Sequence, residues 1–140
     1  MADKKPTVLL VEDDMFLREL CVVKLQKANF EVEYAEDGTQ GLEMLENNSY
    51  DVVLLDIMLP ERDGFELLEE YKDRHGSLEG MVLIMLTNLS EREQVDRAME
   101  LGADDYIIKA HFSPSEIVEK TQEWLEKAKQ DQNQNQKAEE

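Results

Sequence analysis

The stretch DVVLLD, residues 51–56, holds four consecutive aliphatic side chains between two aspartates. An unbroken apolar run of this length is typical of a strand that is buried on both faces, as in the middle of a parallel sheet. Asp56 follows the apolar run at once. The sequence therefore predicts a central buried strand with an acidic side chain at its carboxyl end.

Other short apolar runs alternate with stretches of helical period on both sides of this strand. The further predicted strands cover residues 8–11, 30–35, 81–86 and 106–108. The helix after the first of them is expected to bury Leu17, Leu20, Cys21, Leu25 and Ala28. Strand–helix units at a spacing of roughly 20–25 residues are typical of a parallel sheet covered by helices on both faces. We therefore expect an α/β fold with a doubly wound, five-stranded sheet.

Two helix starts carry capping signals. Ser90 and Glu93 predict a capping box, and Ser113 with Pro114 predicts the start of the last helix. Beyond residue 128 the sequence KQDQNQNQKAEE is of low complexity. We expect one folded domain over residues 1–128 and a polar, disordered tail or linker over residues 129–140.

The composition is strongly acidic, with 33 Asp and Glu against 15 Lys and Arg and a formal net charge of −18. Such a surface disfavours nucleic-acid phosphates and anionic lipid headgroups. The single cysteine, Cys21, excludes an intrachain disulfide and a cysteine-based zinc site. Because neither a secretory leader nor a long uncharged apolar run is apparent, we expect a cytoplasmic protein that binds neither nucleic acid nor membrane.

The candidates for chemistry are the polar residues that follow the predicted strands. Glu12 and Asp13 follow the first strand, Asp56 ends the third, and Thr87 and Lys109 follow the fourth and fifth. Ligands of open parallel sheets bind at the carboxyl ends of the strands, so these side chains are expected to share one pocket. Crowded carboxylates resist ionising together unless a cation is present, and an all-oxygen ligand set suits Mg²⁺. For Asp14 we keep the alternative that it only caps the following helix.

Four motifs, in this order, resemble those of response-regulator receiver domains. They are VLLVEDD (8–14), YDVVLLDIMLPERDGFELL (50–68), MLTN (85–88) and GADDYIIKA (102–110). The resemblance covers roughly residues 5–128, and it implies a chemotaxis-receiver-like, flavodoxin-like fold with strand order 2-1-3-4-5. It also implies a signalling phosphoacceptor that catalyses its own phosphorylation and dephosphorylation, rather than a metabolic enzyme.

The resemblance further implies a role for each candidate side chain. Asp56 would accept the phosphoryl group, and Thr87 and Lys109 would contact its oxygens. Asp13 and Asp56 would bind Mg²⁺ with the backbone carbonyl of Met58, while Glu12 would act through a bound water.

Two further roles concern the output and the lifetime of the phosphoryl group. Tyr106 would be a rotating switch that turns when Thr87 is drawn towards the phosphoryl group, which changes the surface of the fourth helix, fifth strand and fifth helix. Met58 and Leu89 would influence phosphoryl lifetime. Because both are apolar and unable to orient a water, we expect slow autodephosphorylation.

The expected partners are a sensor histidine kinase or phosphotransfer protein as donor, and a downstream protein or missing effector domain as target. The chain is expected to be a monomer or a phosphorylation-dependent dimer. The main alternative is a receiver-like scaffold that binds proteins without phosphorylation. A haloacid-dehalogenase-like phosphatase would need a D-x-D motif after the first strand, and the acids at residues 12–14 would repel the phosphate of a flavin.

One position departs from the family pattern. Most receivers have a proline, in a cis peptide, after the lysine that corresponds to Lys109, whereas this chain has Ala110. A cis peptide before a non-proline residue costs about 2.5–4 kcal/mol. The sequence leaves open whether this peptide is trans or is held cis by its surroundings.

Overall fold

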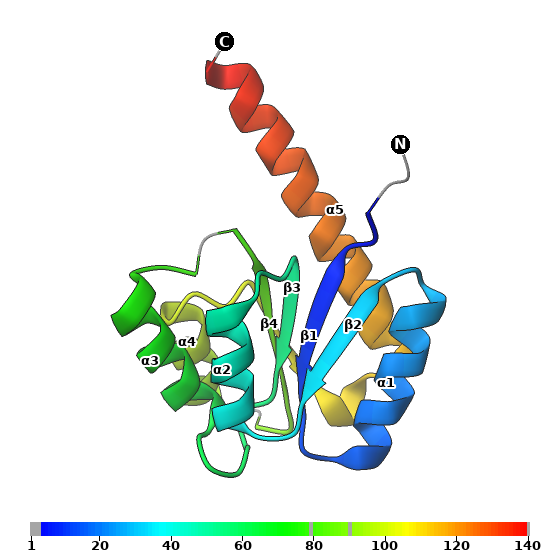
Figure 1. Cartoon of the computed structure of the whole chain (residues 1–140), viewed down its shortest axis with the longest axis vertical. Helices are drawn as coiled ribbons and strands as arrows, with labels where there is room; N and C mark the ends of the chain where they lie inside the picture. Colours follow the sequence, from blue (N-terminus) through cyan, green and yellow to red (C-terminus); the bar gives the residue numbers. More distant parts are fainter. Residues whose placement is uncertain (1–3, 79, 90, 140) are drawn as a thin grey trace.

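A computed structural model describes residues 4–78, 80–89 and 91–139. Its centre is one parallel sheet of five strands in the order β2-β1-β3-β4-β5 (Figure 1). The strands are β1 (Thr7–Val11), β2 (Glu31–Ala35), β3 (Val52–Leu55), β4 (Val82–Thr87) and β5 (Asp105–Ile108). The α/β fold and the strand order predicted from the sequence are confirmed.

Helices cover both faces of this sheet (Figure 1). They are α1 (Met15–Lys27), α2 (Gly38–Asn47), α3 (Gly64–His75), α4 (Arg92–Glu100) and α5 (Pro114–Glu139), with a short 3₁₀ helix, η1 (Lys109–His111). Side chains of α2, α3 and α4 pack in one core layer, and side chains of α1 and α5 pack in the other. The sheet is therefore the middle layer of three.

The central strand has the burial that its sequence predicts. All four residues of β3 have no exposed surface. Val53 and Leu55 pack in the layer of α2, α3 and α4, whereas Val52 and Leu54 face α1 and α5. A strand that alternates between two apolar layers needs apolar residues at every position, which explains the unbroken run.

The buried face of α1 differs from the prediction. Leu20 is 52% exposed, whereas Arg18 is buried with only 8% of its surface accessible. Arg18 shares its face with Cys21 and Leu25, which lie three and seven residues later on the helix. Leu20 instead lies on the outer face, beside Phe16. The prediction for Leu20 is wrong because apolar character alone was used to assign the face.

The start of α4 and the end of α5 both bear on predictions from the sequence. Helix α4 begins at Arg92 after Glu91, which makes no side-chain cap, and the predicted cap residue Ser90 lies outside the described residues. Helix α5 continues beyond Ala128 to Glu139 and projects from the domain (Figure 1). The segment is rich in Gln, Lys and Glu, which are good helix formers, and has no Gly or Pro to end the helix. The domain boundary at residue 128 stays a prediction.

None of the helices over the described residues combines the length and the apolar character needed to cross a membrane.

Candidate functional site

The carboxyl edge of the sheet brings together the acids that follow β1 and β3. Ligand oxygens of Glu12, Asp13 and Asp56 all lie within 4.8 Å of one another. The Asp56 amide donates to Val11 O at 3.0 Å, which continues the pairing of β1 with β3 up to the site. Glu12 is fully buried and Asp56 is 3% exposed, whereas Asp13 is exposed. The cluster therefore has a buried floor and one open side.

Lys109, which follows β5, completes this cluster. Its Nζ lies 2.6 Å from Glu12 Oε1 and 2.6 Å from Asp56 Oδ2. Burial disfavours the charged ammonium, but the two carboxylates outweigh burial and raise the pKa of Lys109. The other oxygen of Asp56, Oδ1, accepts a hydrogen bond from the Met58 amide at 3.2 Å. Both oxygens of Asp56 thus have a donor.

The carboxylate of Glu12 is in the least favourable surroundings of the three acids. Burial raises the pKa of its carboxyl to about 7, and the nearby Asp56 charge adds to the rise, against the contacts with Lys109 and the Asp14 amide. Its Oε1 contacts the Lys109 ammonium at 2.6 Å, and this ammonium is shared with Asp56 Oδ2. One ammonium does not satisfy two buried carboxylates and a third nearby acid. This all-oxygen donor set fits a hard divalent cation such as Mg²⁺.

Hydrogen bonds to the backbone of Leu89 join Thr87, at the carboxyl end of β4, to Tyr106 in β5. Thr87 ends β4 and is 1% exposed. Its Oγ1 accepts a bond from the Leu89 amide at 3.3 Å, and the Tyr106 hydroxyl donates to Leu89 O at 2.5 Å. Burial, with the charge of Asp56, raises the pKa of Tyr106 to about 12, so this hydroxyl stays a donor at neutral pH. Tyr106 is thereby bonded to the loop that leads into α4.

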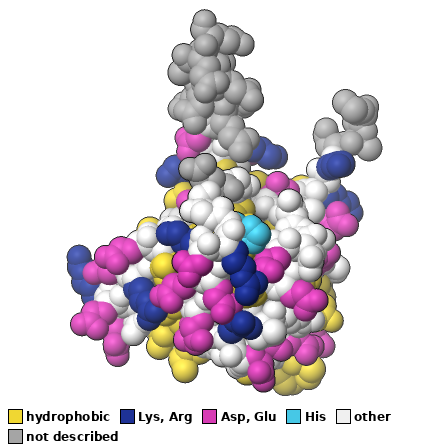
Figure 2. Space-filling model, turned by 60° about the vertical axis from the view of Figure 1, so that its left-hand side comes forward, with side chains coloured by type: hydrophobic (Ala, Val, Ile, Leu, Met, Phe, Trp, Pro, Cys, Tyr) yellow, Lys and Arg dark blue, Asp and Glu magenta, His cyan; other side chains and the backbone are white. Residues whose placement is uncertain are grey.

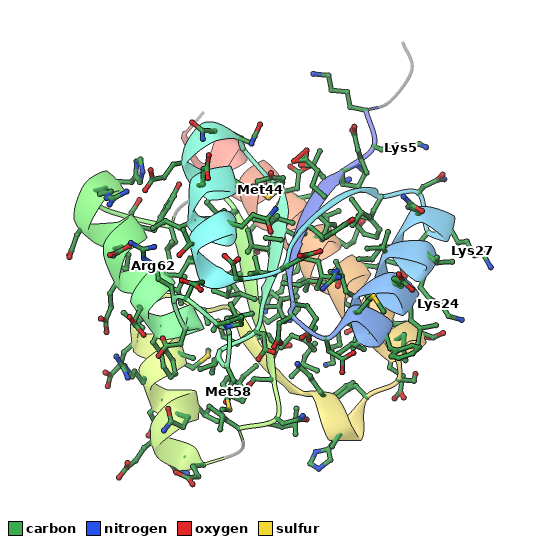
Figure 3. The ribbon with its side chains drawn as sticks, turned by 60° about the horizontal axis from the view of Figure 1, so that its bottom comes forward. Lys5, Lys24, Lys27, Met44, Met58 and Arg62 are labelled. Atoms are coloured by element: carbon green, nitrogen blue, oxygen red, sulfur yellow. The ribbon has the colours of Figure 1, made fainter. Side chains whose placement is uncertain are left out.

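Met58 and Leu89 lie on a groove beside the acids. The groove has a volume of about 620 Å³, and Asp13, Pro60, Phe65 and Arg97 are among its other lining residues. Met58 is 64% exposed, and its side chain points outward from the loop after β3 (Figure 3). The entrance to the acidic cluster therefore has apolar side chains on one side.

Two close backbone contacts fix the loop that carries Met58. The Gly38 amide donates to Pro60 O at 3.2 Å, and an added Cβ at Gly38 would lie 1.8 Å from Arg62 O. At Gly64 an added Cβ would lie 2.5 Å from Asp56 O. The Arg62 side chain, labelled in Figure 3, bonds Glu70 at 2.6 Å. Glycine is needed at both positions because backbone occupies the space of a side chain.

Sequence reasoning missed Arg18 as a member of the site. Its Nη1 donates to the backbone carbonyl of Glu12 at 2.9 Å and to that of Asp13 at 3.4 Å. The available signal was an arginine on the buried side of an otherwise apolar helix face. The peptide between Lys109 and Ala110, left open above, is trans, since no cis peptide occurs in the described part of the chain.

Outside the cluster, acidic and basic side chains intermingle on the face shown in Figure 2. Ion pairs such as Arg97 with Glu69 at 2.7 Å and Arg62 with Glu70 at 2.6 Å join neighbouring segments of the chain. Exposed pairs of this kind contribute about 0–1 kcal/mol each. The ion pairs of Lys109 differ from these exposed pairs because they are buried.

Comparison with known proteins gives a consistent result. Residues 8–122 match the sequence family described as the response regulator receiver domain. The chain is 36% identical over 111 residues to the transcriptional regulatory protein SrrA of Staphylococcus aureus. The aligned stretch covers 79% of this chain and 44% of that protein. The chain therefore spans less than half the length of that relative.

Solved structures resemble the whole sheet and its helices. A CheY-like response regulator receiver domain protein of Methanospirillum hungatei JF-1 has a TM-score of 0.81 and 31% identity, covering 91% of this chain and 98% of the other. The chemotaxis response regulator CheY4 of Vibrio cholerae has a TM-score of 0.76 and 27% identity, covering 86% and 98%.

Proposed function

The chain belongs to the response regulator receiver domain family of two-component systems, and from that premise we propose that Asp56 accepts a phosphoryl group. The observation that carries the proposal is the environment of Asp56. Its carboxylate is buried at the carboxyl edge of the sheet, within ligand distance of two other acids and 2.6 Å from the Lys109 ammonium. A nucleophilic carboxylate beside a cation and a metal-type donor set is suited to phosphoryl transfer.

The proposed reaction is an in-line displacement on phosphorus. An oxygen of Asp56 forms the new O–P bond, the P–N bond of a donor phosphohistidine breaks, and its electron pair returns to the imidazole, which then binds a proton. Lys109 turns from Asp56 Oδ2 to one phosphoryl oxygen, and the Thr87 hydroxyl donates to another. Glu12, Asp13, Asp56 and the Met58 carbonyl would hold Mg²⁺, which when bound offsets negative charge on the phosphoryl oxygens.

We propose that hydrolysis of the aspartyl-phosphate is slow. Met58 and Leu89 line the groove beside the acids, and neither side chain can hold a water in line with the O–P bond. The expected phosphoryl half-life, followed by mass after removal of the donor, is minutes or longer. A half-life of a few seconds would contradict this proposal.

The proposed output surface is formed by α4, β5 and α5. Support comes from the bonds that join Thr87, Leu89 and Tyr106, because they connect the phosphoryl site to the loop that precedes α4. A shift of Thr87 towards the phosphoryl group would change the Leu89 loop and, through it, this surface. The target would be a downstream protein or an effector domain outside this chain.

The proposed donor is a sensor histidine kinase or phosphotransfer protein in the cytoplasm. A protein donor has to cover the open side of the site, beside Asp13. Helix α1 begins two residues after Asp13 and exposes 75% of Phe16 and 52% of Leu20, which gives such a donor an apolar surface to contact. We assign this activity to a receiver domain over residues 1–128, as a monomer or a phosphorylation-dependent dimer.

The test is intact mass after incubation with Mg²⁺ and phosphoramidate. The wild-type chain should gain one phosphoryl group, and chelation of Mg²⁺ should abolish the gain. Asp56→Asn should gain nothing. Asp51→Asn is the matched control, because Asp51 lies at the opposite end of β3, and it should be phosphorylated normally.

A second candidate function is a scaffold that binds its partner without phosphorylation. The specific observation in its favour is that the Tyr106 hydroxyl donates to Leu89 O, so the residue proposed as the switch is held by the loop that precedes α4. Under this alternative, a folded wild-type chain that binds Mg²⁺ takes up no phosphoryl group, and its partner binds Asp56→Asn as tightly as wild type.

A further inference from the structure

Arg18 makes contacts that an ordinary surface arginine of a helix would not make. It lies in the first turns of α1 and only 8% of its surface is accessible. Its Nη1 reaches back to the carbonyls of Glu12 and Asp13, at 2.9 and 3.4 Å. Its Nη2 lies 3.4 Å from Glu36, and its guanidinium packs over the Tyr34 ring at 5.2 Å. One side chain therefore joins α1, β2 and the loop after β1.

The two carbonyls belong to Glu12 and Asp13. The carboxylate of Glu12 forms the buried floor of the acidic cluster, and that of Asp13 forms its open side. The Glu12 amide is already fixed, since it donates to Ala35 O at 3.1 Å. The Asp14 amide donates to Glu12 Oε2 at 3.0 Å. Because Arg18 donates to the two carbonyls, both N–H and C=O groups of this loop are hydrogen-bonded, and its peptide groups have little freedom to rotate. The backbone fixes the direction of the Cα–Cβ bond of each residue and so limits the positions that its carboxylate can take.

We infer that Arg18 is a positioning residue for the metal-binding loop, and that it sets the affinity for Mg²⁺ without contacting the ion. This inference rests on the proposed function of the acidic cluster. Groups that orient metal ligands from outside the first layer of contacts typically change metal affinity by 10–100-fold when removed. Arg18 acts on the backbone of two ligand residues at once, so its removal is expected to weaken binding of the ion and leave the later chemistry unchanged.

The experiment compares Arg18→Met with wild type by calorimetric titration with Mg²⁺ and by the electron paramagnetic resonance of free Mn²⁺. Arg18→Met keeps the length and apolar stem of the side chain but removes both hydrogen bonds. We expect its Kd for Mg²⁺ to rise by about 10-fold. The Mg²⁺ concentration for half-maximal phosphorylation by phosphoramidate should rise by the same factor. The maximal rate at saturating Mg²⁺ should stay within about twofold of wild type, because Asp56, Thr87 and Lys109 are intact.

Two control variants separate positioning from general effects. Glu36→Gln removes the ion pair of Arg18 but leaves both carbonyl bonds, and Arg74→Met removes an exposed arginine on α3 that pairs with Glu46. Both should bind Mg²⁺ like wild type. Arg18→Lys, which can reach one carbonyl at a time, should have an intermediate Kd and serves as the test variant if Arg18→Met does not fold.

The inference is overturned if a folded Arg18 variant binds Mg²⁺ like wild type, or if its maximal rate falls while its Kd is unchanged. It is also overturned if Glu36→Gln weakens binding as much as Arg18→Met. Should wild type bind Mg²⁺ but take up no phosphoryl group, the proposed phosphoryl transfer fails. The Kd values of the variants then still decide the role of Arg18.

Discussion

Both edges of the sheet carry aspartates, but these aspartates have different partners. At the amino edge, Asp51 accepts bonds from the Thr7 amide at 2.8 Å and the Thr7 hydroxyl at 3.3 Å. Asp104, before β5, accepts from the Leu83 amide at 2.8 Å. At the carboxyl edge, Asp56 and Glu12 share the single ammonium of Lys109.

The surroundings of these acids explain the difference. Asp51 and Asp104 each accept from a main-chain amide of another segment, that of Thr7 or Leu83, and so stabilise the sheet. Glu12 and Asp56 also accept from main-chain amides, those of Asp14 and Met58, but their carboxylates are buried together, so they need a cation as well. Similar residue types thus serve stability at one edge and binding at the other.

The largest expected effect contrasts a threonine at each edge. Thr87→Val removes the hydroxyl proposed to donate to a phosphoryl oxygen, and the phosphorylation rate should fall about 10–100-fold, since a hydrogen bond to a charged group contributes about 1.5–3 kcal/mol. Thr7→Val, at the amino edge, should leave the rate unchanged. Initial rates with phosphoramidate, measured by intact mass, compare the two. Equal rates for both variants would contradict the division between the edges.

A smaller effect concerns the metal alone. Mg²⁺ at about ten times its Kd should stabilise the wild-type chain by about 1.4 kcal/mol. For a domain of this size the Tm rises by about 4 °C. Asp51→Asn should show the same rise, whereas Asp56→Asn should show a much smaller one. Thermal unfolding with Mg²⁺ and with a chelator measures the difference, and a Tm of Asp56→Asn that rises as far as that of wild type would show that the ion binds elsewhere.

Asp51→Ala should cost about 1 kcal/mol of unfolding free energy, because it leaves the Thr7 amide without its acceptor. Asp51 is exposed, so water replaces part of the lost bonding and the cost stays small. Urea unfolding gives the free energy, and the phosphorylation rate should be unchanged. A variant as stable as wild type, or one that is phosphorylated more slowly, would contradict a purely structural role for Asp51.

The smallest effect is a pH dependence. Burial raises the pKa of Tyr106 to about 12, and the charge of Asp56 adds to it. The folded chain therefore keeps this proton where the unfolded chain releases it, so stability is full below pH 10 and falls as the pH rises from 10 towards 12. Tyr106→Phe should show a shallower fall between pH 9.5 and about 10.5 in urea unfolding. Parallel curves for the two proteins would argue against the raised pKa of Tyr106.

Much of the fold could be predicted because the chain signals it locally. Strands β1, β3 and β4 are short, mainly apolar runs, and the candidate site follows from asking which polar residue stands after each predicted strand. Leu20 was assigned to the buried face and Arg18 was missed, because an arginine can be buried when its guanidinium contacts carbonyls, which no hydrophobic pattern records. The bond from Tyr106 to Leu89 O and the trans peptide at Ala110 depend on tertiary packing, so they required the structure.

The glycines at 38 and 64 restrict which sequences this loop can accept. In a library that samples every substitution, the cluster acids can be exchanged for amides with the backbone unchanged, whereas alanine at either glycine meets a backbone oxygen at 1.8 or 2.5 Å. The least reactive residues near the site should therefore be the least replaceable. In a deep mutational scan selected for folding alone, positions 38 and 64 should tolerate fewer residues than position 56.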